Sequence, residues 1–150
     1  MPSPDHTQCR EQLARLMAEQ NARLAALEVL LKQEYELLQA RDAEGLEQAG
    51  TARQECIGHI LRIEDERQAL CRVTGRGDDP SALHSLLAWC DPDGLLRPAM
   101  QEYRDRTARC REQNDRNGML VNSRRQQEGR TYGPDSDESR GYGRKLVTRA

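Results

Sequence analysis

Apolar residues in the first forty positions recur every three or four residues, which is the spacing of one face of a helix. These residues are Leu13, Leu16, Met17, Leu24, Leu27, Leu31, Tyr35 and Leu38. Neither glycine nor proline occurs between residues 5 and 44, and Thr7 is the predicted N-cap. A helix of this length exceeds the usual globular helix, so the pattern favours coiled-coil-like packing against other helices.

A second apolar face follows a break at Asp42 and Gly45, a segment that is either a short turn or the start of a helix capped by Asp42. The face comprises Leu46, Ala49, Cys56, Ile60, Ile63, Leu70 and Cys71. Charged residues from Glu64 to Arg67 are predicted to lie mostly off it. The breakers that end this helix are Gly75, Gly77 and Pro80. Because the connection is short, the first two helices should be antiparallel.

A short third helix is predicted over residues 81–89, with Asp79 as its N-cap and Pro80 at its first position. Its apolar patch consists of Leu83, Leu86 and Leu87. Such a short helix is not stable alone. It is therefore expected to cover one end of the hairpin, with Trp89 over the line of buried side chains.

The last long helix should begin between Leu95 and Pro98, and one stripe along it changes from apolar to polar. The stripe reads Leu96, Met100, Tyr103, Thr107, Cys110, Asn114, Asn117 and Val121. Helix interiors disfavour Asn and Gly, so Asn114, Asn117 and Gly118 indicate a role other than helix stability. Two interpretations stay open. The asparagines set the register of a coiled coil, or they hydrogen-bond a partner that approaches the backbone at Gly118.

Composition supports an all-α protein, an elongated antiparallel hairpin or bundle of three long helices with one short helix. Aromatic residues make up 3%, charged residues 32%, and the mean hydropathy is -0.92, which suits thin lines of contact between helices better than a broad core. Residues 1–122 are predicted to form the helical domain and 123–150 a flexible basic tail. That tail holds seven Arg or Lys and four Asp or Glu. Because the remainder is acidic, nucleic-acid binding is disfavoured.

No combination of residues predicts catalysis, a metal site or a cofactor. His59 follows Cys56 by three residues and His84 precedes Cys90 by six, but neither pair has a second half with metal-ligand spacing. The five cysteines include no C-x-x-C, and no apolar run is long enough for a membrane span or a signal-peptide core. We therefore expect a non-enzymatic protein of the reducing cytoplasm, without stable membrane insertion.

The order long, long, short, long helix, with Trp89 in the short one, resembles the FlgN family of flagellar export chaperones. The signature Asn114-x-x-Asn117-Gly118 followed by an apolar pair also resembles that family. The segment that begins at Tyr132 and continues Gly-Pro-Asp resembles the family's tail.

This resemblance implies a cytoplasmic chaperone for the hook-filament junction proteins FlgK and FlgL. It would bind their C-terminal amphipathic helices and deliver them to the export gate protein FlhA. The residues implied in client binding are Met100, Tyr103, Met119, Leu120 and Val121. Those implied in gate docking are Asn114, Asn117, Gly118 and Tyr132. The alternative is a structural coiled-coil adaptor that homodimerises through the same helices; as a chaperone the chain would be a monomer or weak homo-oligomer.

Overall fold

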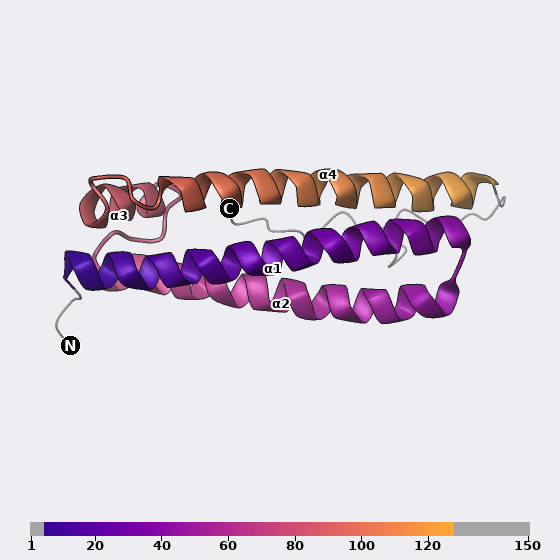
Figure 1. Ribbon diagram of the computed structural model, residues 1–150, viewed down its shortest axis with the longest axis horizontal. Helices are drawn as coiled ribbons and strands as arrows, with labels where there is room; N and C mark the ends of the chain where they lie inside the picture. The colour runs from indigo at the N-terminus through magenta and orange to yellow at the C-terminus, as the bar shows by residue number, and fades with distance from the viewer. Residues whose placement is uncertain (1–4, 128–150) are drawn as a thin grey trace.

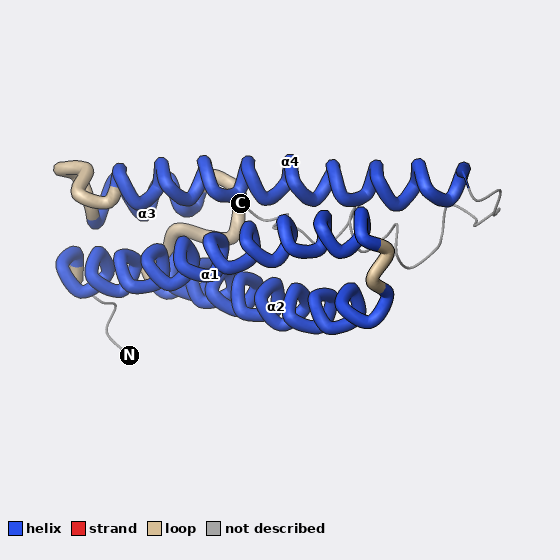
Figure 2. The backbone as a smooth tube through the Cα atoms, turned by 45° about the vertical axis from the view of Figure 1, so that its right-hand side comes forward, coloured by secondary structure: helices blue, strands red, loops and turns tan. Residues whose placement is uncertain are grey.

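The computed structural model describes residues 5–127, and over this range the chain forms four helices and no strand. Their bounds are α1 His6–Ala40, α2 Ala43–Val73, α3 Ala82–Cys90 and α4 Arg97–Gln127. The helix α1 lies between α2 and α4, and the three long helices form an elongated bundle (Figures 1 and 2). The prediction of an all-α bundle with an antiparallel first pair is confirmed. None of the helices in this part of the chain has a stretch long and apolar enough to span a membrane.

Aspartate carboxylates cap the N-terminal ends of α1 and α2. Asp5 Oδ1 accepts a hydrogen bond from the backbone N–H of Gln8 at 2.8 Å, and Gln8 Oε1 accepts from the Asp5 N–H at 3.3 Å. This reciprocal capping box makes Asp5 the N-cap, so the prediction of Thr7 is wrong. At the next turn Asp42 Oδ1 accepts from the Gly45 N–H at 2.9 Å, which confirms Asp42 as the cap of α2.

The start of α3 also differs from the prediction. Its N-cap is Ser81, and Pro80 lies in the preceding turn. Asp79 instead stabilises that turn, because its Oδ1 accepts from the Ser81 N–H at 3.1 Å and from the Ser81 hydroxyl at 2.7 Å. The Asp79 carboxylate therefore binds Ser81 and does not cap α3.

The short helix α3 covers the end of the bundle where α1 begins, as predicted (Figure 1). The half-buried Trp89 ring lies 4.3 Å from the His6 ring, centroid to centroid, and the Arg76 guanidinium carbon lies 4.8 Å from its centroid. Trp89 therefore joins the start of α1 to the segment that follows α2.

The core is a narrow line of side chains along α1, in three clusters. The one under α3 contains Cys9, Leu13, Met17, Leu70, Cys71, Ala82, Leu86, Cys90 and Leu96. The central one contains Leu24, Leu27, Leu31, Cys56, Ile57, Ile60, Tyr103 and Cys110. At the far end only Leu38 and Val121 are buried, with Leu46 and Leu120 packed against them. The core thus becomes thinnest where α4 ends.

Several charged side chains lie inside the bundle. Glu64 and Arg67 have exposed fractions of 0% and 7%, so the prediction that they lie off the buried face is wrong. The Arg67 side chain reaches across to α4, where its guanidinium carbon lies 6.0 Å from the centroid of the Tyr103 ring. Between α1 and α2, Arg53 Nε pairs with Glu34 Oε1 at 3.0 Å.

The helix α4 begins at Arg97, inside the predicted interval, and continues to Gln127. The expected boundary after residue 122 therefore falls within α4. Tyr132 and the predicted flexible tail lie outside the described residues, and the division into a domain and a tail stays a prediction.

Candidate functional site

The two asparagines of the predicted stripe on α4, Asn114 and Asn117, are buried and not exposed to solvent. The Asn117 side chain is fully buried; its Nδ2 donates to the Leu31 carbonyl on α1 at 2.8 Å, and its Oδ1 accepts from Gln113 Nε2 at 2.9 Å. Asn114 is also buried, with an exposed fraction of 4%, and Gly118 is half-buried. The geometry fits the interpretation in which Asn117 fixes the register of α4 on α1.

Three side chains of α4, spaced seven residues apart, donate hydrogen bonds to backbone carbonyl groups of α1. Besides Asn117, Cys110 Sγ donates to the Leu24 carbonyl at 3.5 Å, and Arg124 Nη2 donates to the Gln39 carbonyl at 3.0 Å. The donors are spaced by seven residues, and the acceptors advance in the same direction, so α1 and α4 are parallel and pack with a heptad-like period. The spacing of Cys110, Asn117 and Arg124 was the available sequence signal for this pairing.

A second set of contacts between α1 and α4 is electrostatic. Glu28 of α1 lies 3.2 Å from Arg109 and 3.9 Å from Arg106 of α4, and 3.4 Å from Lys32 of its own helix. Partial burial raises the pKa of Glu28, but Arg109 and Lys32 outweigh that effect and hold the pKa below its usual value. These pairs are partly exposed, so they orient the helices more than they stabilise the fold.

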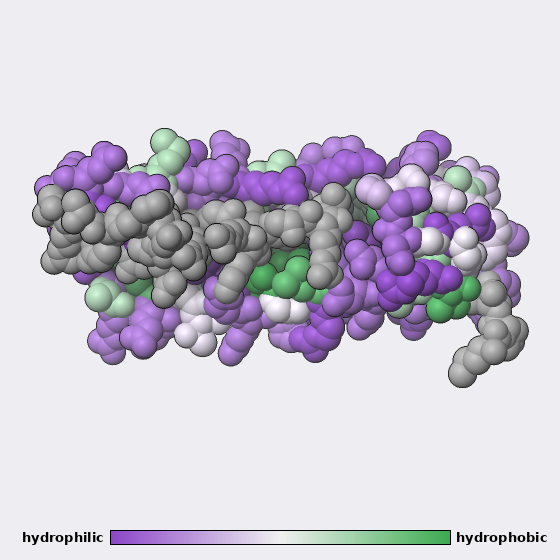
Figure 3. Space-filling model, turned by 180° about the vertical axis from the view of Figure 1, so that it is seen from behind, coloured by the Kyte–Doolittle hydropathy of each residue, from purple (hydrophilic) through white to green (hydrophobic). Residues whose placement is uncertain are grey.

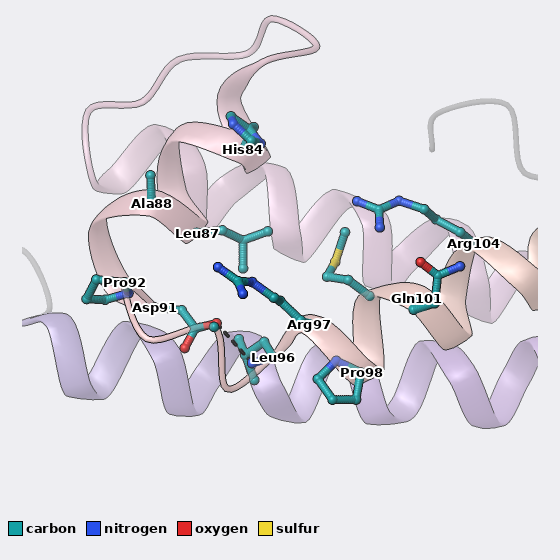
Figure 4. Close-up of a pocket in the computed structure, with 12 residues that line it drawn as sticks. His84, Leu87, Ala88, Asp91, Pro92, Leu96, Arg97, Pro98, Gln101 and Arg104 are labelled. Carbon is teal, nitrogen blue, oxygen red and sulfur yellow. Dashed lines mark hydrogen bonds between the residues drawn. The ribbon is translucent and has the colours of Figure 1, made fainter.

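The residues implied in client binding do not form one surface. Met119 has an exposed fraction of 72%, and Leu120 beside it is half-buried, whereas Val121 and Tyr103 are each 6% exposed and belong to the core. Met100 lies nineteen positions before Met119, roughly 28 Å away along the helix axis. It lines a separate pocket between α3 and α4 (Figure 4).

The exposed apolar side chains are spread over the described part of the chain. Within residues 5–127, the large apolar side chains that are exposed are Val29 (55%), Val73 (59%), Leu95 (63%) and Met119 (72%). On the face seen in Figure 3, the visible apolar areas are separated by hydrophilic ones. On this face the visible apolar side chains therefore form separate patches.

Burial affects the chemistry of the polar groups near Tyr103 and of the thiols. Burial raises the pKa of the Tyr103 hydroxyl, although the nearby Arg67 guanidinium acts in the opposite direction. All five cysteines are buried and free, in agreement with the predicted packing role of Cys56, Cys71 and Cys110. Burial raises the pKa of Cys9 and of Cys110 to about 12. Within residues 5–127, no group of three or more His, Cys, Asp or Glu residues is placed to hold a metal ion.

The chain matches the model of a known protein family. The model of the FlgN family, described as FlgN protein, matches residues 9–132, which include all of α2, α3 and α4 and nearly all of α1. No curated protein and no solved structure matches the chain. The match covers more than half of the chain and agrees with the helix order described above. The chain belongs to the FlgN family and is a flagellar export chaperone.

Proposed function

We propose that this chaperone acts in the cytoplasm on the hook-filament junction proteins FlgK and FlgL. It holds their C-terminal amphipathic helices before export and delivers them to FlhA. Membership of the FlgN family supports the general role. The observation that carries the site is Met119, whose side chain is 72% exposed at the end of α4 where the core is thinnest.

Met119 and Leu120 make the first contact with the client helix in this proposal. Met119 has a flexible side chain that adapts to different apolar partners, and Leu120 is already half-buried against the cluster of Leu38 and Val121. A client helix laid over this cluster extends the core of the bundle. Each large apolar side chain that becomes buried contributes about 1.5–3 kcal/mol. Micromolar affinity needs about 8 kcal/mol, so the client also contacts neighbouring residues of α1 and α2.

Asn114, Asn117, Gly118 and Tyr132 remain the proposed contributors to docking at FlhA. Both amides are buried, and Asn117 donates to the Leu31 carbonyl of α1, so in the closed bundle Asn117 holds α4 in register. Direct contact between their amides and FlhA would require α4 to separate from α1. Gly118 is half-buried beside the exposed Met119, so the backbone there is open to a partner without such a movement.

The client proposal is tested by fluorescence anisotropy with labelled C-terminal peptides of FlgK and FlgL. Met119→Asp should raise the Kd at least tenfold, because a charge replaces apolar contact area. Ala108→Asp is the matched control, since Ala108 is exposed on α4 away from this cluster. Unchanged affinity of the Met119 variant, or no binding of either peptide to the unmodified chain, would refute the proposed client surface.

The structural adaptor stays the alternative, and molar mass measured over a range of concentrations separates it from the chaperone. A chaperone of this proposal forms a one-to-one complex with a junction-protein peptide and then binds the cytoplasmic domain of FlhA. A concentration-dependent dimer that ignores the peptides and FlhA would favour the adaptor.

A further inference from the structure

A pocket of about 820 Å³ lies between α3 and the first turns of α4. Leu87 of α3 and Leu96 and Met100 near the start of α4 provide apolar lining. The rim residues Arg97 and Arg104 are exposed, so the pocket is an open groove on the surface (Figure 4). Its volume lies within the ~300–1,000 Å³ of ordinary ligand sites.

The charge of the groove is positive. Figure 4 shows the Arg97 and Arg104 side chains extending from α4 toward α3, where Leu87 enters the same space. Within residues 5–127, neither guanidinium forms a hydrogen bond or an ion pair. The one carboxylate in the lining, that of Asp91, is 7% exposed and accepts from the Leu95 and Leu96 N–H groups at 2.9 Å each. Asp91 is therefore occupied by the backbone, and the two arginines are left for another partner.

The backbone at Gly94 leaves room for the Arg97 side chain in its present position. Gly94 has φ 72°, in the left-handed region, and a Cβ placed on it would lie 2.6 Å from Arg97 Nε. Any side chain at Gly94 would thus displace Arg97 from its present position. Arg97 and Arg104 are seven residues apart, so they lie on one face of α4, separated by about 10.5 Å along its axis.

We propose that this groove binds an acidic amphipathic helix of a partner protein. Two carboxylates of that helix, seven residues apart, pair with Arg97 and Arg104, and an apolar side chain between them enters the space lined by Leu87, Leu96 and Met100. Two helical turns separate such carboxylates by the same distance as the arginines. The groove lies at the opposite end of α4 from Met119, so this site goes beyond the proposed client surface.

The probe is a fluorescein-labelled, alanine-based helical peptide of about 16 residues. It carries two Glu seven residues apart, with Leu three and four residues after the first Glu. Two control peptides replace both Glu by Gln or both Leu by Ser. Binding to the full chain is followed by fluorescence anisotropy at low and at physiological ionic strength, because exposed ion pairs weaken with salt.

The double variant Arg97→Gln/Arg104→Gln should weaken binding about fivefold, as expected for the loss of two exposed ion pairs of ~0.5 kcal/mol each. The control Arg15→Gln/Arg116→Gln removes the same charge at exposed positions outside the groove, and its Kd should stay unchanged. Leu87→Ser tests the apolar part and should weaken the Glu peptide but not the already weak Ser peptide. Circular dichroism checks that each variant keeps its helices.

Equal Kd values for the two double variants would overturn the proposal, since net charge alone would then explain the binding. Equal affinity for the Glu and Gln peptides, or no saturable binding to the unmodified chain, would overturn it as well. Met119→Asp should bind this probe normally, and the Arg97/Arg104 variant should bind the FlgK and FlgL peptides normally. The failure of one site is thereby distinguished from the failure of the other.

Discussion

The most informative substitution is Asn117→Ala, because it separates a residue that holds α4 in place from a residue that meets a partner. The Asn117 amide is fully buried and forms two hydrogen bonds, one to the Leu31 carbonyl of α1 and one from Gln113. Alanine removes both bonds and leaves the buried Gln113 amide without this acceptor.

The expected loss follows from these contacts. Each hydrogen bond contributes about 1 kcal/mol net, and an unsatisfied buried amide costs about 1–3 kcal/mol. Alanine recovers roughly 0.6 kcal/mol through its higher helix propensity. The free energy of unfolding should therefore fall by about 2.5–4.5 kcal/mol. For a chain of this size, that change lowers the Tm by roughly 5–18 °C.

Urea unfolding followed by circular dichroism measures this difference, with Asp115→Ala as the control. Asp115 is exposed on the opposite side of the same turn of α4, so its replacement should change the free energy by less than ~0.5 kcal/mol. If Asn117→Ala is as stable as the Asp115 variant, the amide does not hold α4 on α1. The reasoning from burial would then be refuted, and Asn117 would be free to serve in docking at FlhA.

Three further predictions concern other parts of the bundle. Arg53→Ala should destabilise the fold by about 3–5 kcal/mol in urea unfolding, because it removes the guanidinium that pairs with the buried Glu34 carboxylate, whereas Glu34→Leu/Arg53→Met should retain most of the stability. Burial raises the pKa of Cys9 and Cys110 from 9.0 to about 12, so the unfolded chain loses these protons first. The stability that depends on the protonated thiols is complete below pH 9 and is lost as the pH rises toward 12, which thermal melts across that range measure. Asp91→Asn weakens the hydrogen bonds to the Leu95 and Leu96 N–H groups, so amide hydrogen exchange in the first turns of α4 should accelerate while that of α2 stays constant.

Helix ends required contacts that periodicity does not contain. The apolar spacing predicts four helices in the correct order, but residue type alone predicts Thr7 and Asp79 as N-caps, and both predictions are wrong. In the structure the reciprocal bonds of Asp5 and Gln8 select an earlier start for α1. The Asp79 carboxylate bonds to Ser81, so α3 begins after Ser81.

The candidate site was predicted less completely than the fold. The asparagines were located on the correct stripe, since a stripe depends only on spacing along one helix. Whether that stripe faces solvent, a partner or another helix depends on where α4 packs. The groove beside Arg97 and Arg104 combines residues of α3 and α4, and no pattern within either segment indicates it.

The sequence by itself determined that the chain is helical, where its long helices lie and that its core is thin, because these properties depend on local spacing and on overall composition. Only the tertiary structure decided that α1 is central and parallel to α4, that Glu64 and Arg67 are buried, and that Asn117 points inward while Met119 points outward. Burial depends on which side of a helix meets a neighbouring helix. Side chains two positions apart on the same helix point in different directions.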